Sequence, residues 1–479
     1  MKRRNFLGLS VAGSGALLAG RAVAMMPSVG GASRSPNIVY VFADQWRAQA
    51  TGYAGDPNLK GLTPNLDRLA AEGVNFTHAV STCPVCTPYR ASMLTGQYPL
   101  TNGLFLNDLS LNPDAVSIGK VLKGVGYNTA YVGKWHVDGK GRGSYIPKER
   151  RQGFDYWKVL ECTHNYNHSR YYDGDDPKAK MWDGYDAIAQ TRDVQGYITD
   201  HAGDDRPFCM FLSLGPPHAP YATAPEKNRN LFDPALIRLR PNFKGDESEY
   251  RKRLAGYYAH ITALDECMGA LLQTLEEAGI ADDTLLVFTS DHGDMLGSHR
   301  QNCKQQPYDE SIRVPFLVRL PKGAGMNGRE VDMPFGTPDI MPTILGLCGI
   351  PVPRSVEGTD FSGVVSGAVD APENEVLIEC PSPFGEWMRK WGGREYRGIR
   401  TKRFTYVRDL NGPWLLFDNE KDPYQMNNLV NSPDAAGWMQ ELNAKLSAKL
   451  KEVGDEFNTG PSYIEKWGYT VDDTGTVPY

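Results

Sequence analysis

The sequence lacks an internal repeat of fixed period, a low-complexity tract and a long block of like charge. These absences exclude a repeat array and a charged, disordered interaction tail. The net charge of −6 and the pI near 5.9 argue against a nucleic-acid-binding surface. The 479 residues are 41% hydrophobic and 23% charged, as in soluble globular proteins. A chain of this length can bury a large core and still form a second, smaller domain.

Cysteine is also scarce, because eight cysteines are too few for a disulfide scaffold in a chain of this length. Six of them are scattered, and we interpret them as small buried hydrophobic residues: Cys162, Cys209, Cys267, Cys303, Cys348 and Cys380. Cys83 and Cys86 instead form C-P-V-C, a spacing that by itself allows a redox dithiol or half of a zinc site. The sequence has no second C-x-x-C, so a zinc knuckle would lack its other pair of ligands.

Residues 1–24 are predicted to be a twin-arginine export signal. Arg3 and Arg4 precede an apolar, small-residue stretch over residues 8–20, and A-V-A at 22–24 fits a signal-peptidase site. The stretch is short for a membrane span and contains several glycines. We therefore expect the Tat export machinery as a partner, a periplasmic or extracellular location, and no stable membrane anchor.

Apolar runs alternate with helical patterns over residues 36–370. Strands are expected at 37–42, 129–132, 208–214, 285–289 and 314–320, and helices at 62–73, 117–126 and 247–279. This order predicts an α/β domain with a mainly parallel central sheet and helices on both faces. Short strand-like runs at 375–379, 397–400, 404–407 and 414–417, then a helix at 434–453, predict a smaller C-terminal α+β domain over 371–479 with an antiparallel sheet.

Polar residues that suit a catalytic site follow four of the predicted strands. These residues are Asp44, Lys134, His136, His218, Asp291 and His292. In open α/β sheets, ligands bind beyond the carboxyl ends of the strands. We therefore expect these side chains to share one site.

Residues 86–96 read C-T-P-Y-R-A-S-M-L-T-G, which resembles the maturation signature of type I sulfatases of the alkaline phosphatase superfamily. Further segments resemble family motifs in the expected order: A-D-Q-W-R at 43–47, G-K-W-H at 133–136, P-P-H-A-P-Y at 216–221 and S-D-H-G at 290–293. The resemblance continues with Lys304 and a C-terminal signature, and spans residues 36 to 430 with gaps. It implies that a formylglycine-generating maturation enzyme converts Cys86 to formylglycine, an aldehyde whose hydrate is the nucleophile.

The resemblance also implies a divalent cation. A sulfate ester is an anion, so the site must neutralise its oxygens while it aims the nucleophile, and a hard cation with oxygen ligands suits that task. Asp44, Gln45, Asp291 and His292 are expected to bind the metal with the modified Cys86. Many sulfatases have two aspartates where this chain has Asp44-Gln45, and asparagine where it has His292. Calcium is the first expectation, and the nitrogen ligand leaves manganese open.

Arg90 is expected one turn after Cys86 on a helix, where by resemblance it would hold the aldehyde hydrate. The helix N-terminus at Cys86 favours developing negative charge. Lys134 and Lys304 are cations that would hold sulfate oxygens.

His218 is expected to protonate the leaving oxygen as general acid, a task that Lys304 shares. His136 would help expel sulfate. Asp291 would take the proton from the attacking hydrate.

The substrate is expected to be a sulfated carbohydrate or an aryl sulfate. His299, Trp387 and Arg389 are the predicted substrate contacts, because exposed tryptophan stacks on sugars and arginine pairs with anionic groups. The basic segment W-M-R-K-W-G-G-R at 387–394 can also be an ordinary surface loop. A phosphonate or phosphodiester hydrolase of the same superfamily is the nearer alternative function. A non-catalytic C-x-x-C thiol or metal-binding protein is the remote one.

Overall fold

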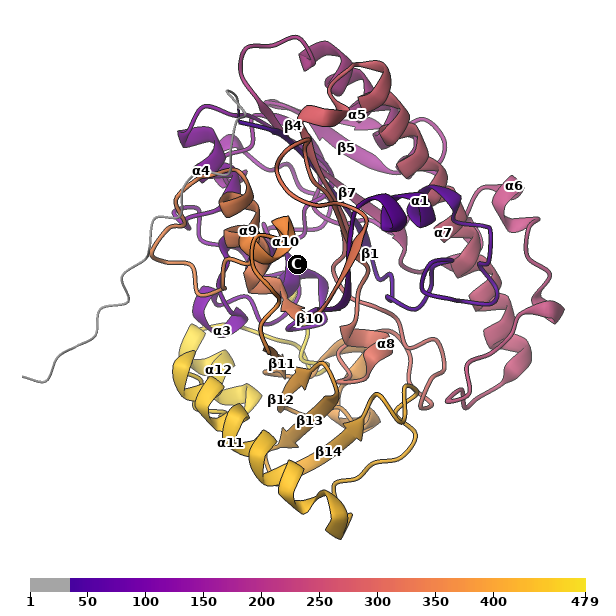
Figure 1. Cartoon of the computed structure of the whole chain (residues 1–479), viewed down its shortest axis with the longest axis vertical. Coiled ribbons are helices and arrows are strands. Elements are labelled where there is room, and N and C mark those ends of the chain that lie inside the picture. Colours follow the sequence, from indigo (N-terminus) through magenta and orange to yellow (C-terminus); the bar gives the residue numbers. More distant parts are fainter. Residues whose placement is uncertain (1–34) are drawn as a thin grey trace, which may run out of the picture.

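The computed structural model describes residues 35–479, which form a large mixed sheet and a smaller antiparallel sheet (Figure 1). The export signal predicted for residues 1–24 lies outside the described residues. Among residues 35–479, no helix is both long and apolar enough to cross a membrane.

The large sheet has ten strands in the order β10-β2-β9-β8-β1-β7-β3-β4-β5-β6. Their bounds are β1 Asn37–Asp44, β2 Val74–Val80, β3 Asn128–Lys134, β4 Tyr156–Leu160, β5 Arg170–Asp173, β6 Asp176–Met181, β7 Phe208–Pro217, β8 Thr284–Ser290, β9 Phe316–Arg319 and β10 Arg329–Gly336. The central strands β8, β1, β7, β3 and β4 are parallel to one another. Strands β9 and β5 are antiparallel to both of their neighbours, and the edge strand β6 is antiparallel to β5. The predicted mainly parallel sheet is therefore confirmed.

Alternate residues of the buried central strands fill two separate cores. In β1, Ile38, Tyr40 and Phe42 face one core, and Val39 and Val41 face the other. Helices α2 Cys86–Thr95, α4 Ile118–Gly124, α9 Ile340–Leu347 and α10 Ser362–Ser366 cover the first face. Helices α1 Pro64–Glu72, α5 Asp186–His201 and α7 Glu247–Glu277 cover the second (Figure 1). Three further helices are short: α3 Pro99–Asn102, α6 Glu226–Arg229 and α8 Asp309–Ile312.

The second sheet has the order β11-β12-β13-β14 and is antiparallel throughout, as predicted. Its strands are β11 Glu375–Cys380, β12 Tyr396–Thr401, β13 Phe404–Asp409 and β14 Gly412–Asp418. Helix α11 Ala436–Glu452 packs on one face through Leu442 and Leu446. The other face packs against Val80 and Ile312 of the larger unit. Helix α12 Gly460–Trp467 follows and packs beside α3 (Figure 1).

Candidate functional site

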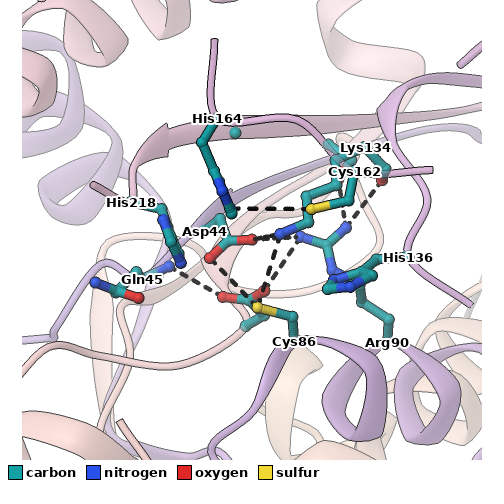
Figure 2. A network of polar contacts seen from close by, with 12 residues as sticks. Asp44, Gln45, Cys86, Arg90, Lys134, His136, Cys162, His164 and His218 are labelled. Carbon is teal, nitrogen blue, oxygen red and sulfur yellow. Dashed lines mark hydrogen bonds and ion pairs between the residues drawn. The ribbon is translucent and has the colours of Figure 1, made fainter. Parts of the chain in front are cut away.

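The carboxyl ends of the central parallel strands meet at a buried polar cluster (Figure 2). Asp44 is the last residue of β1 and Lys134 the last residue of β3. His218 follows β7, and Asp291 directly follows β8. The shared site predicted from strand ends is therefore present in the fold.

Four side chains in this cluster can hold a metal ion. One ligand atom each from Asp44, Cys86, Asp291 and His292 lies within 4.8 Å of the others, and all four residues are buried. His292 Nδ1 lies 2.9 Å from the carbonyl oxygen of Gly293, to which it can donate, leaving Nε2 as an acceptor facing the cluster. Two carboxylates and one imidazole nitrogen suit a divalent cation, so the residues present fit the expected metal.

Gln45 lies beside these four residues, and hydrogen bonds hold both its side-chain amide and its backbone N–H. Its Oε1 accepts a hydrogen bond from Lys304 Nζ at 3.2 Å, and its Nε2 donates to Asp294 Oδ2 at 2.7 Å. Its backbone N–H donates to Asp291 Oδ1 at 3.0 Å. Asp294 thus orients the amide so that its oxygen faces the site, and metal binding by Gln45 stays a prediction.

Arg90 bridges the carboxylates of Asp44 and Asp291. Its Nη2 lies 3.2 Å from Asp44 Oδ2 and 3.1 Å from Asp291 Oδ2, and none of the three side chains is exposed. Its Nη1 donates to the carbonyl of Lys134 at 2.9 Å and to Ser213 Oγ at 2.7 Å. Burial works to raise the pKa of Asp44, but Lys134, the nearby histidines and Arg90 outweigh it and hold that pKa well below its usual value. The ionised carboxylate is therefore available to a cation.

Cys86 is the first residue of α2, and two lysines flank its side chain. Lys134 Nζ lies 3.7 Å and Lys304 Nζ 3.4 Å from Sγ, while Lys134 Nζ also contacts Asp44 Oδ2 at 2.5 Å. Burial raises the pKa of the Cys86 thiol to about 12, so the unmodified side chain is a neutral, weak nucleophile. The Sγ atom stands where a hydroxyl of a formylglycine hydrate would lie, because both are bonded to Cβ. Two cations and a helix N-terminus there suit an anionic group.

His218 and Lys304 form a hydrogen-bonded pair beside Cys86. His218 Nδ1 lies 2.9 Å from the Ala219 carbonyl, and its Nε2 lies 3.1 Å from Lys304 Nζ. Burial and then the Lys304 charge hold the pKa of His218 well below its usual value. In this arrangement Lys304 holds the proton that the two groups share.

His136 lies deeper than His218. Its Nε2 is 3.2 Å from Asp108 Oδ1, and Asp108 is in turn held by Arg142 at 2.8 Å. Burial and then Lys134 lower the pKa of His136 to about 3. His136 Nδ1 and Arg90 Nε are buried with no hydrogen-bond partner among residues 35–479. A bound anion or hydrate can satisfy such atoms.

The three predicted substrate contacts are not part of this cluster. His299 stacks on Tyr308 with ring centroids 4.1 Å apart. Trp387 is only 3% exposed and belongs to the core beneath the second sheet, so the expectation of an exposed indole is wrong: the ring fills space against Tyr396. Arg389 Nη1 and Nη2 donate to the two carboxylate oxygens of Glu395 at 2.5 and 2.6 Å, so Glu395 already neutralises the charge of this guanidinium.

Glu386 and His164 also face the site, although neither was predicted from the sequence. Glu386 Oε1 lies 3.6 Å from Lys304 Nζ. The loop before β12 therefore reaches the site through Glu386, the residue before the predicted contact Trp387. His164 stacks on His218 (Figure 2). It follows β4, a parallel neighbour of β3, so the strand-end rule would have found it had β4 been predicted.

Comparison with known proteins identifies the class. The sequence model of the Sulfatase family matches residues 36–350, and that of the "N-sulphoglucosamine sulphohydrolase, C-terminal" family matches 297–453. An ulvan-active sulfatase of Formosa agariphila is 47% identical over 93% of this chain and 87% of its own length. An endo-4-O-sulfatase of Bacteroides thetaiotaomicron is 32% identical over 90% and 94%. A solved structure from a Bacteroides thetaiotaomicron study of glycosaminoglycan metabolism has a TM-score of 0.78, 30% identity and coverage of 93% and 100%.

These matches define a hydrolase of the alkaline phosphatase superfamily. Within it, the chain belongs to the sulfatase family, and its activity is that of a sulfuric ester hydrolase. The resemblance of the motifs to those of type I sulfatases is thereby confirmed as family membership. The family membership sets aside the C-x-x-C alternative, a non-catalytic thiol or metal-binding protein, and Cys83 is packed in the hydrophobic core.

Proposed function

We propose that this sulfatase is an exported enzyme that removes sulfate from a polysaccharide, with formylglycine at position 86 and a bound calcium ion. One observation carries the proposal: Cys86 begins a helix, two lysine ammonium groups flank its side chain, and its Sγ lies within 4.8 Å of ligand atoms of two carboxylates and an imidazole. The 47% identity to an ulvan-active sulfatase supports a polysaccharide substrate. The maturation enzyme and the Tat machinery are the partners that the motif and the N-terminal arginines imply.

The metal would be held by Asp44, Asp291 and His292, with Gln45 Oε1 as a further oxygen. Calcium remains our first choice because three of these four ligands are oxygens, and the imidazole keeps manganese as the second. When bound, the cation neutralises sulfuryl oxygens and the formylglycine hydrate supplies the hydroxyl nucleophile.

The chain's own residues divide the remaining work. Lys134 and Lys304 hold the sulfate oxygens, because both ammonium groups already lie beside position 86. Arg90 keeps two buried carboxylates in place. Asp291 accepts the proton of the attacking hydroxyl, and the pair of Lys304 and His218 delivers one to the leaving oxygen.

His136 is proposed to act after this first displacement. Asp108 holds its buried imidazole through Nε2, which leaves Nδ1 without a hydrogen-bond partner in the described part of the chain. Nδ1 can therefore hydrogen-bond to sulfate as it is released. His299, Trp387 and Arg389 carry no part of this scheme, since their side chains are engaged elsewhere.

Sulfate release from ulvan and from a panel of glycosaminoglycans tests the substrate class. The enzyme, produced with a maturation enzyme, should release sulfate that ion chromatography detects, and Cys86→Ala should release none. Phenyl phosphonate is the control for the alternative hydrolase. Faster turnover of phenyl phosphonate than of every sulfate ester would contradict the proposal.

A further inference from the structure

His164 occupies a place in the site that none of the sequence motifs covers. It lies in the segment after β4. Its ring faces that of His218 with centroids 4.3 Å apart and planes 2° from parallel. Figure 2 shows His164 between His218 and Cys162, above the Asp44 carboxylate.

This stacking completes the support of His218. The two in-plane contacts of that ring are Nδ1 to the Ala219 carbonyl at 2.9 Å and Nε2 to Lys304 Nζ at 3.1 Å. In-plane hydrogen bonds set the direction of the nitrogens but leave the ring faces open. His164 closes one face, so that His218 cannot tilt on that side without losing the stack.

His164 is itself held in place by a contact with Cys162. Its Nε2 lies 3.9 Å from Sγ of Cys162, and the backbone N–H of Cys162 donates to the carbonyl of Arg142 at 3.1 Å. Burial, followed by the charge of Lys134, lowers the pKa of His164 to about 3, so the ring is neutral and can stack without charge repulsion. A fixed neutral ring is a suitable support for a second imidazole.

We propose that His164 is a positioning residue for protonation of the leaving group. Its ring fixes His218 so that the His218–Lys304 pair faces the oxygen that departs from sulfur. The hydroxyl at position 86 bonds to sulfur and gives its proton to Asp291, while the departing oxygen keeps the electron pair of the broken S–O bond and takes a proton from the His218–Lys304 pair. That pair regains a proton from the water consumed in hydrolysis. The inference rests on the proposed function and adds a residue to it.

Three variants test this role: His164→Ala, His164→Phe and, as matched control, His168→Ala. Phenylalanine keeps a flat ring without nitrogen, whereas His168 is an exposed histidine of the same segment. The probes are ulvan oligosaccharide, whose alkoxide needs a proton, and 4-nitrophenyl sulfate, whose phenolate hardly does. Values of kcat and KM are measured separately, with the aldehyde and metal content of each protein.

His164→Ala should lower kcat on the oligosaccharide by up to roughly 10²-fold, as small misplacements of a catalytic group do. KM and 4-nitrophenyl sulfate turnover should change little. His164→Phe should recover most of the loss, and His168→Ala should match wild type.

Wild-type kcat for His164→Ala on the oligosaccharide would overturn the inference, as would equal losses on both probes or equal losses for the alanine and phenylalanine variants. A wild-type enzyme with full aldehyde that desulfates neither ulvan nor the glycosaminoglycan panel would instead defeat the proposed function.

Discussion

Replacing Arg90 by methionine should destabilise the metal-free protein strongly. The guanidinium is unexposed and bridges Asp44 and Asp291 at 3.2 and 3.1 Å, so its loss removes one shared cation from two neighbouring buried carboxylates and leaves Asp44 with Lys134. Removing one partner of a buried ion pair costs about 3–5 kcal/mol. With two carboxylates affected, we expect the upper part of that range in the free energy of unfolding.

Urea unfolding in the presence of EDTA measures this loss through tryptophan fluorescence. Both proteins are made without the maturation enzyme, so that residue 86 is a thiol in each. Added Ca²⁺ should recover part of the loss, because a cation bound between the same carboxylates stabilises the folded state.

The matched control is Arg253→Met, which removes an exposed pair with Glu249 at 2.9 Å. Pairs of that kind contribute about 0.3–0.5 kcal/mol, so this variant should unfold almost as wild type does. Equal urea midpoints for Arg90→Met and wild type in EDTA would refute the view that Arg90 neutralises the two carboxylates.

Three more predictions concern the metal, the leaving group and pH. Asp291→Asn should weaken calcium binding in a calorimetric titration and lower turnover, and full wild-type activity after verified removal of all metal would contradict the metal site. His218→Ala should lose roughly 10²–10⁴-fold in kcat/KM on a sugar sulfate but far less on 4-nitrophenyl sulfate, whereas Lys134→Ala should impair both alike; equal His218→Ala losses on both would leave Lys304 as the better acid. Burial raises the pKa of Asp186 to about 7, so the folded state binds the extra proton and the contribution of this carboxyl to stability falls as pH rises from about 4 to 7. Asp186→Asn should flatten that fall in thermal unfolding between pH 5 and pH 8, and an unchanged slope would count against it.

Much of the fold could be predicted because the central strands are continuous apolar runs. β1, β7 and β8 are buried along their whole length, and their sequences show it. β10 was not predicted, because Pro334 interrupts it and its register shifts at that point. β6 is exposed at every residue and has no hydrophobic pattern to detect.

The site could be predicted as far as strand ends and motifs reach. Asp44, Lys134 and Asp291 follow strands that are evident in the sequence. His164 follows β4, a strand of only five residues in which Lys158 interrupts the aromatic and apolar ones, and this short run was not assigned as a strand. Trp387 was misplaced because composition does not reveal whether a tryptophan in a loop points into the core or toward solvent.

The most direct test of the account is a mass spectrum of the Cys86 peptide from active enzyme produced with a maturation enzyme. The account predicts the mass of an aldehyde in place of the thiol, and reaction of that peptide with a hydrazide probe. Active enzyme in which Cys86 is fully alkylated as a free thiol would contradict formylglycine as the nucleophile.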